Sequence, residues 1–184
     1  ASGATWASAD SAGRVTMYIS ANSGQPGENA DFRKAVQSAV NKEDVVQGAT
    51  EGYATIIDID MCPSYSGHPS GYQVVEQDVE KAKEYFAASG LDPADCGFAI
   101  ICSDDMKLRQ GQVIQSCLKE NLGIETTLES MDLATYLDVT ATGDYQAAIG
   151  NYTASSVLAF SQGVYHSMSI NGSNKTRLNN PEID

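Results

Sequence analysis

Basic residues are scarce in this chain of 184 residues, which has 11 lysines and arginines against 24 aspartates and glutamates and a formal net charge of −13. This balance excludes the basic surface that nucleic-acid binding requires. It also argues against binding to an anionic membrane surface without a separate anchor. No apolar run approaches the ~20 residues of a membrane-spanning helix. The chain instead has the composition and length of about one globular domain, with 42% hydrophobic and 19% charged residues.

The motifs of common catalytic and cofactor sites are also missing. The sequence has no G-x-G-x-x-G, P-loop, H-E-x-x-H or G-x-S-x-G motif. The two histidines, His68 and His166, fall in polar segments, so an extracytoplasmic hydrolase would have few candidates for a catalytic base. We therefore predict a protein that is not an enzyme and that holds neither a cofactor nor a metal.

The cysteines follow no zinc-binding spacing, because none of them forms a C-x-x-C pair. Cys102 alternates with Phe98 and Ile100, and Cys117 lies on an apolar helical stripe. Both patterns predict buried thiols that act as small hydrophobic side chains. A disulfide involving at least one of the four cysteines is the alternative; they are Cys62, Cys96, Cys102 and Cys117.

Asp58 and Asp60 alternate in a segment that could be extended, with Cys62 and His68 nearby. A hard cation needs more oxygen ligands at short reach than two carboxylates provide. We predict a solvated strand face here rather than a metal site.

Strand and helix signals alternate along the chain. Strands are predicted at 15–20, 97–102, 124–128 and 145–152. Helices are predicted to begin near 29–31, 42, 78, 107, 132 and 155. Residues 1–14 form a loose lead-in, and 53–76 and 166–180 form loops. The β-α-β-α-β order from residue 97 predicts a layered α/β fold, with a single lobe over 15–184.

Four stretches form a series of amphipathic helices, caps and stops. They are DFRKAVQSAVNKEDVV at 31–46, DVEKAKEYFAASGL at 78–91, IQ through LGI at 114–124, and GDYQ at 143–146 with NNPEID at 179–184. In this order they resemble the extracytoplasmic solute-binding proteins of peptide and nickel ABC transporters, family 5. The resemblance implies the C-terminal lobe of a two-lobed, type II periplasmic-binding-protein-like fold, in which a mixed sheet is flanked by helices.

The resemblance also implies a function. Such a receptor binds a solute, here an oligopeptide or dipeptide, between two lobes outside the cytoplasm, and delivers it to an ABC permease. Both chain ends look cut, so we expect a fragment whose first lobe lies elsewhere in the protein. Any contact with the membrane would come through an upstream lipid anchor. A sensory or scaffold module with the same fold is the alternative.

The candidate binding residues follow from strand direction, because ligands of open α/β sheets lie outside the carboxyl ends of the strands. The candidates are Ser103, Asp105, Met131, Leu133, Asn151, Tyr152, Thr153 and Ser155. Tyr152 could supply an aromatic wall and Asn151 a hydrogen-bonding amide. Packing of Tyr152 within the lobe is an equal alternative.

The sequence leaves the chemical class of the ligand open. By the resemblance, peptide receptors often place an aspartate just after the last of these strands, where it pairs with the peptide's α-ammonium group. This sequence has Thr-Ala-Ser-Ser at 153–156. A blocked, longer or differently oriented peptide, a sugar, an opine or a metal chelate therefore stays open as the ligand.

Overall fold

The computed structural model describes residues 13–59, 71–153 and 156–184. Its strands are β1 (Gly13–Ile19), β2 (Phe98–Cys102), β3 (Thr126–Ser130) and β4 (Ala147–Thr153). Its α-helices are α1 (Ala30–Ala39), α2 (Lys42–Thr50), α3 (Val79–Ser89), α4 (Asp105–Leu122), α5 (Leu133–Thr142) and α6 (Val157–Val164). Two short 3₁₀ turns, η1 (Pro26–Glu28) and η2 (Ser167–Ser169), complete these elements. No helix among the described residues is long and apolar enough to cross a membrane.

The four strands form one mixed sheet in the order β1-β4-β2-β3. The central strand β2 is parallel to both β3 and β4, while β1 is antiparallel to β4. The parallel pairs follow from the helical crossovers α4 and α5, which return the chain to the same end of the sheet. The predicted α/β class with a mixed sheet is confirmed.

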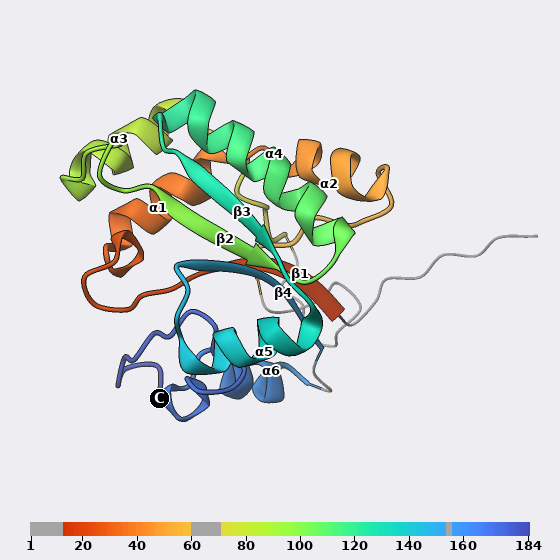
Figure 1. The fold of residues 1–184 in the computed structure, drawn as a ribbon. Helices are drawn as coiled ribbons and strands as arrows, with labels where there is room; N and C mark the ends of the chain where they lie inside the picture. The colour runs from red at the N-terminus through yellow and green to blue at the C-terminus, as the bar shows by residue number, and fades with distance from the viewer. Residues whose placement is uncertain (1–12, 60–70, 154–155) are drawn as a thin grey trace, which may run out of the picture.

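Helices cover both faces of this sheet unequally (Figure 1). Helices α1, α3 and α4 pack on one face with α2 against α4, and α5 and α6 lie on the other. The larger core lies under the first group, and the alternation of Phe98, Ile100 and Cys102 points these side chains into it. Cys102 and Cys117 are buried and free, as predicted, and Cys96 is buried and free as well, whereas Cys62 lies outside the described residues.

The helix ends follow the capping signals of the sequence. Side-chain oxygens accept backbone N–H bonds at the N-caps Asn29, Asn41, Asp78, Asp104 and Asp132. Left-handed glycines end three helices: Gly90, Gly123 and Gly143.

Strand β3 runs over Thr126–Ser130, two residues later than the predicted 124–128. The physical reason lies in the end of α4. Ile124 is buried, but its N–H donates to the carbonyl of Leu118 and so completes the helix cap instead of a sheet ladder. At the other end of the chain, β1 starts at Gly13, inside the predicted lead-in.

The prediction of a solvated strand face at Asp58 is wrong. Residues 53–59 are irregular, and the Asp58 side chain is only 7% exposed. Its carboxylate accepts the N–H of Val75 at 2.6 Å and lies 3.4 Å from the ammonium of Lys42. These bonds tie the long loop to the start of α2. Asp60, Cys62 and His68 lie outside the described residues.

Candidate functional site at the carboxyl edge of the sheet

The loops after β2 and β3 lie side by side at one edge of the sheet. Cys102 is paired with Ser130 in the parallel ladder, and the N–H of Met131 donates to the Cys102 carbonyl at 3.0 Å. Helices α4 and α5 begin directly after these loops. The structure therefore brings the candidates Ser103 and Asp105 to the same edge as Met131 and Leu133.

The end of β4 projects beyond this edge. Ala148 of β4 is paired with Ile101, and β4 continues five residues further, to Thr153, whereas β2 continues only to Cys102. The difference of four residues corresponds to ~13 Å at ~3.3 Å per residue. Beyond β2, the last residues of β4 pair with β1, where Gly13 lies opposite Thr153. Asn151, Tyr152 and Thr153 thus stand on a two-stranded ribbon, not level with the other candidates.

An ion pair between a buried lysine and a half-exposed aspartate organises the loop after β2. Lys107 is only 6% exposed, and its ammonium binds the Asp104 carboxylate and lies 3.5 Å from the hydroxyl of Ser103. Partial burial by itself would raise the pKa of Asp104, but its bonds with Lys107 outweigh burial and hold that pKa below the usual range. Asp104 is thereby committed to the loop, and Asp105, the next residue, is exposed.

The loop after β3 also ends in an aspartate that caps the following helix, but no lysine pairs with this aspartate among the described residues. The Asp132 carboxylate accepts the N–H groups of Ala134 and Thr135 and the hydroxyl of Thr135. The hydroxyl bond of Thr135, followed by its backbone bond, lowers the pKa of Asp132. Met131 is half-buried against the core beneath α5, whereas Leu133 is exposed. Of the candidates in this loop, Leu133 therefore faces solvent most openly.

Tyr152 packs within the lobe. Its ring lies edge-on to Phe160 of α6, with centroids 5.2 Å apart, and its hydroxyl lies against Gly163. The guanidinium of Arg14, on the neighbouring strand, lies 4.3 Å from the centroid of the same Phe160 ring. These contacts match the packing alternative for Tyr152 and leave the ring half-buried. Whether its remaining surface contacts a ligand stays a prediction.

The remaining candidates on the ribbon differ in what the structure describes. Asn151 and Thr153 are exposed on β4, on the face opposite Tyr152. Ser155 lies outside the described residues. Asn151 and Thr153 therefore present a polar surface at the projecting end of the sheet.

Sequence reasoning missed two residues of this region. Arg14 was placed in the lead-in, although its alternation with Thr16 and Tyr18 could have assigned it to a strand face. Lys107 was placed at a helix start, although it follows the cap Asp104 by three residues, a spacing that lets a lysine reach back to its cap. A cavity of about 310 Å³ lies beside the edge strand β1, between Arg14, Arg33 and Tyr165, and includes none of the predicted candidates.

In an open sheet with helices on both faces, ligands bind outside the carboxyl ends of the strands, where this structure gathers polar loops and helix starts. The chain belongs to the bacterial extracellular solute-binding proteins, family 5, whose middle part matches residues 3–172. Among curated proteins, the oligopeptide-binding protein OppA of Bacillus subtilis is 28% identical over 142 residues. This alignment covers 72% of the chain but only 26% of OppA.

Solved structures show the same fold. OppA of Listeria monocytogenes, bound to peptide, superposes with a TM-score of 0.80 at 14% identity, over 93% of this chain and 36% of that one. DppA of Helicobacter pylori, in complex with the peptide STSA, gives 0.78 at 21% identity over 94% and 34%. The murein tripeptide binding protein MppA of Escherichia coli gives 0.77 at 18% identity over 92% and 34%. The chain thus spans about a third of these structures.

Proposed function

We propose that this chain is the C-terminal ligand-binding lobe of the substrate-binding component of an ABC importer for oligopeptides or dipeptides. Outside the cytoplasm, the solute binds between this lobe and the first lobe. The closed receptor then delivers the solute to a membrane permease. The observation that carries the proposal is the match of residues 3–172 to a family of extracellular solute-binding proteins. The relatives named above as peptide-binding proteins support the solute class.

The carboxyl edge supplies the lobe's half of the contacts. Ser103, Asp105, Met131 and Leu133 form one part of the binding surface. Asn151, Tyr152 and Thr153 on the β1–β4 ribbon form the other, together with Ser155, which follows them in the sequence. The ~13 Å offset of the ribbon favours an elongated ligand, because a small compact solute could not touch both parts at once. Asp104 and Asp132 cap helices and position these loops rather than contact the solute.

We propose that the amino terminus of a peptide solute is bound by residues outside 153–156. The run Thr-Ala-Ser-Ser at 153–156 carries no carboxylate, so this segment offers hydroxyl and backbone hydrogen bonds to the ligand instead of an ion pair. Peptides with a blocked or displaced amino terminus should then bind as well as free ones. A non-peptide solute that is equally elongated is the second candidate, favoured by the same missing carboxylate.

Native mass spectrometry of the intact two-lobed protein tests this function. The protein is purified without denaturation and sprayed before and after exchange of its bound molecules. A co-purified adduct with a peptide fragmentation pattern is expected, and its removal should lower the melting temperature by mass action. A protein free of adducts, with no shift on addition of peptide pools, would contradict the peptide receptor and favour the sensory alternative.

A further inference from the structure

Asp105 and Leu133 hold equivalent positions at the carboxyl edge. Each is the first residue of a helix and follows the aspartate that caps that helix. Each lies three positions beyond a member of the last ladder pair, Cys102 and Ser130. Both side chains are exposed, and the helices that they begin lie on opposite faces of the sheet. The edge therefore presents a carboxylate on one side of the sheet and an apolar side chain on the other.

The carboxylate of Asp105 is not used to hold the lobe together. Its neighbour Asp104 binds the ammonium of Lys107, and Asp132 accepts the hydrogen bonds that cap α5. In the part of the chain that the structure describes, no cation and no hydrogen-bond donor pairs with the Asp105 carboxylate. This charge is therefore available to a ligand at the proposed solute surface.

The cations near this surface are already engaged. Lys107 is buried against Asp104. Arg14, on the strand beside β4, lies over the Phe160 ring and donates to the carbonyl of Ile59 at 3.2 Å. Residues 120–174, which include β3, β4 and the loops that follow them, contain six acidic residues and no lysine or arginine. This lobe therefore offers the solute a negative potential, which attracts a cation.

A basic side chain matches the pair of Asp105 and Leu133. Lysine and arginine combine an apolar stem with a cationic end. The stem can cover Leu133, which is 59% exposed, while the ammonium or guanidinium group pairs with Asp105. An acidic side chain would bring two like charges together. A purely apolar side chain would leave the Asp105 carboxylate without a partner when the receptor closes over the solute.

We infer that Asp105 and Leu133 select peptides that carry a lysine or arginine side chain. The inference rests on the proposed function, because it takes the carboxyl edge as part of the solute-binding surface. The offset of ~13 Å between this edge and the end of the ribbon corresponds to about four residues of extended peptide. The basic residue therefore lies about four positions from the peptide residue that binds at Thr153.

Calorimetry with the intact two-lobed receptor tests this inference. The probes are alanine-based pentapeptides, blocked at both ends, with lysine, norleucine or glutamate at the first or the fifth position. Norleucine keeps the four-carbon stem of lysine and lacks its charge. In one of the two positions, the lysine peptide should bind about tenfold more tightly than the norleucine peptide, and the glutamate peptide should bind most weakly. The advantage of lysine should shrink as salt is added.

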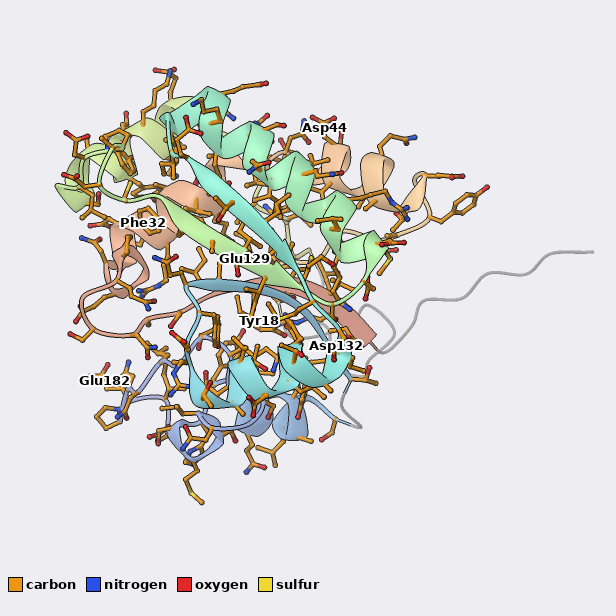
Figure 2. The ribbon with its side chains drawn as sticks, viewed as in Figure 1. Tyr18, Phe32, Asp44, Glu129, Asp132 and Glu182 are labelled. Atoms are coloured by element: carbon orange, nitrogen blue, oxygen red, sulfur yellow. The ribbon has the colours of Figure 1, made fainter. Side chains whose placement is uncertain are left out.

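Two exposed aspartates provide the test variant and its matched control. Asp105→Asn removes the charge at nearly constant size and should abolish the preference for lysine over norleucine. Asp44→Asn makes the same change in the first turn of α2 and should leave the preference intact. Figure 2 shows Asp44 on the outer helical layer, away from Asp132 and the start of α5. Both variants should melt at the wild-type temperature, because both side chains are exposed.

The outcomes separate this inference from the proposed function. Equal affinities of the wild type for the lysine and norleucine peptides overturn the inference while the proposed function stands. A preference that persists in Asp105→Asn also overturns it. The same holds if a free amino terminus, rather than the lysine side chain, brings the gain in affinity. A receptor that binds neither these peptides nor any peptide pool contradicts the proposed function, and the inference falls with it.

Discussion

The two faces of the sheet are built differently. Under α1, α3 and α4, the aromatic rings of Phe32, Phe86 and Phe98 pack with centroids 6.0–6.4 Å apart, among aliphatic and thiol side chains. Under α5, Tyr136 and Thr140 are buried beside Ile101, and the two leucines of the helix, Leu133 and Leu137, are exposed. The first face carries the larger apolar core, whereas the helix on the second face leaves Leu133 and Leu137 exposed. The two sides of one sheet therefore differ in how much of their apolar surface is buried.

Replacing an aromatic residue of the first face should have the largest effect. Phe32 has no exposed surface and contacts two other rings. Phe32→Ala should lower the free energy of unfolding by about 3–5 kcal/mol. Leu137→Ala on the second face should change it by less than about 0.5 kcal/mol. Urea unfolding followed by circular dichroism compares the two, and equal losses would contradict the difference between the faces.

Overpacking should disturb the second face at α6. A Cβ added to Gly163 would lie 2.0 Å from the Tyr152 hydroxyl and 2.8 Å from its ring carbon Cζ. Gly163→Ala should therefore cost about 1–3 kcal/mol as the ring is displaced. Tyr152→Phe removes the closer of these two contacts, so the double variant should recover part of the loss in a double-mutant cycle. Strictly additive losses would show that Tyr152 does not pack against Gly163.

The two capping aspartates at the carboxyl edge should contribute unequally to the free energy of unfolding. Asp104 holds a buried lysine, so Asp104→Asn should cost about 1–2 kcal/mol, an amount discounted because the carboxylate is half-exposed. Asp132→Asn, whose carboxylate caps α5 in solvent, should cost less. Because folding lowers the pKa of Asp104, its contribution is present above the unfolded pKa of ~3.9 and is lost as the pH falls below it.

Thermal melts of the Asp104 variant and the wild type from pH 7 to pH 3 measure this convergence. The gap should be constant above the unfolded pKa of ~3.9 and should narrow as the pH falls below it toward the lowered pKa of the folded protein. A gap that stays constant down to pH 3 would assign the loss to something other than the ion pair.

Two buried tyrosines should respond in opposite ways. The Tyr145 hydroxyl donates to the carbonyl of Lys175, and burial raises the pKa of this tyrosine to about 12. The Tyr136 hydroxyl is buried with no hydrogen-bond partner among the described residues. Tyr145→Phe should cost about 1 kcal/mol, whereas Tyr136→Phe should be neutral or slightly stabilising. Chemical denaturation measures both, and a larger loss at Tyr136 would indicate a partner for its hydroxyl.

Much of the fold could be predicted from local signals. The caps Asn29, Asp78 and Asp132, and stops such as Gly90, act over one helical turn, so the sequence alone locates these helices. The strand at Ile124 was misplaced because a helix cap and a ladder both bury an aliphatic residue. The environment of Asp58 depends on Lys42 and Val75, far away in the sequence, and no local pattern reports such a contact.

The candidate site was predictable in its location but not in its shape. Strand direction identifies the carboxyl edge from sequence order alone. The ribbon that carries Tyr152 projects because β1 pairs with β4 in antiparallel register. The alternation of a sequence predicts a strand but not which other strand it pairs with. The exposure of Leu133 and Leu137 could not be predicted either. Tyr136 and Val139 form a second apolar stripe on the same helix, and helical periodicity alone does not tell which of the two stripes faces the sheet.

Shared binding by two lobes is the central claim, and calorimetry tests it most directly. Peptides eluted from the intact receptor are titrated into the full-length protein and into this lobe alone. The account predicts micromolar or tighter binding by the full-length protein, and no measurable heat with the single lobe, which offers about half of the contacts. Micromolar binding by the lobe alone, or none by the intact protein, would contradict it.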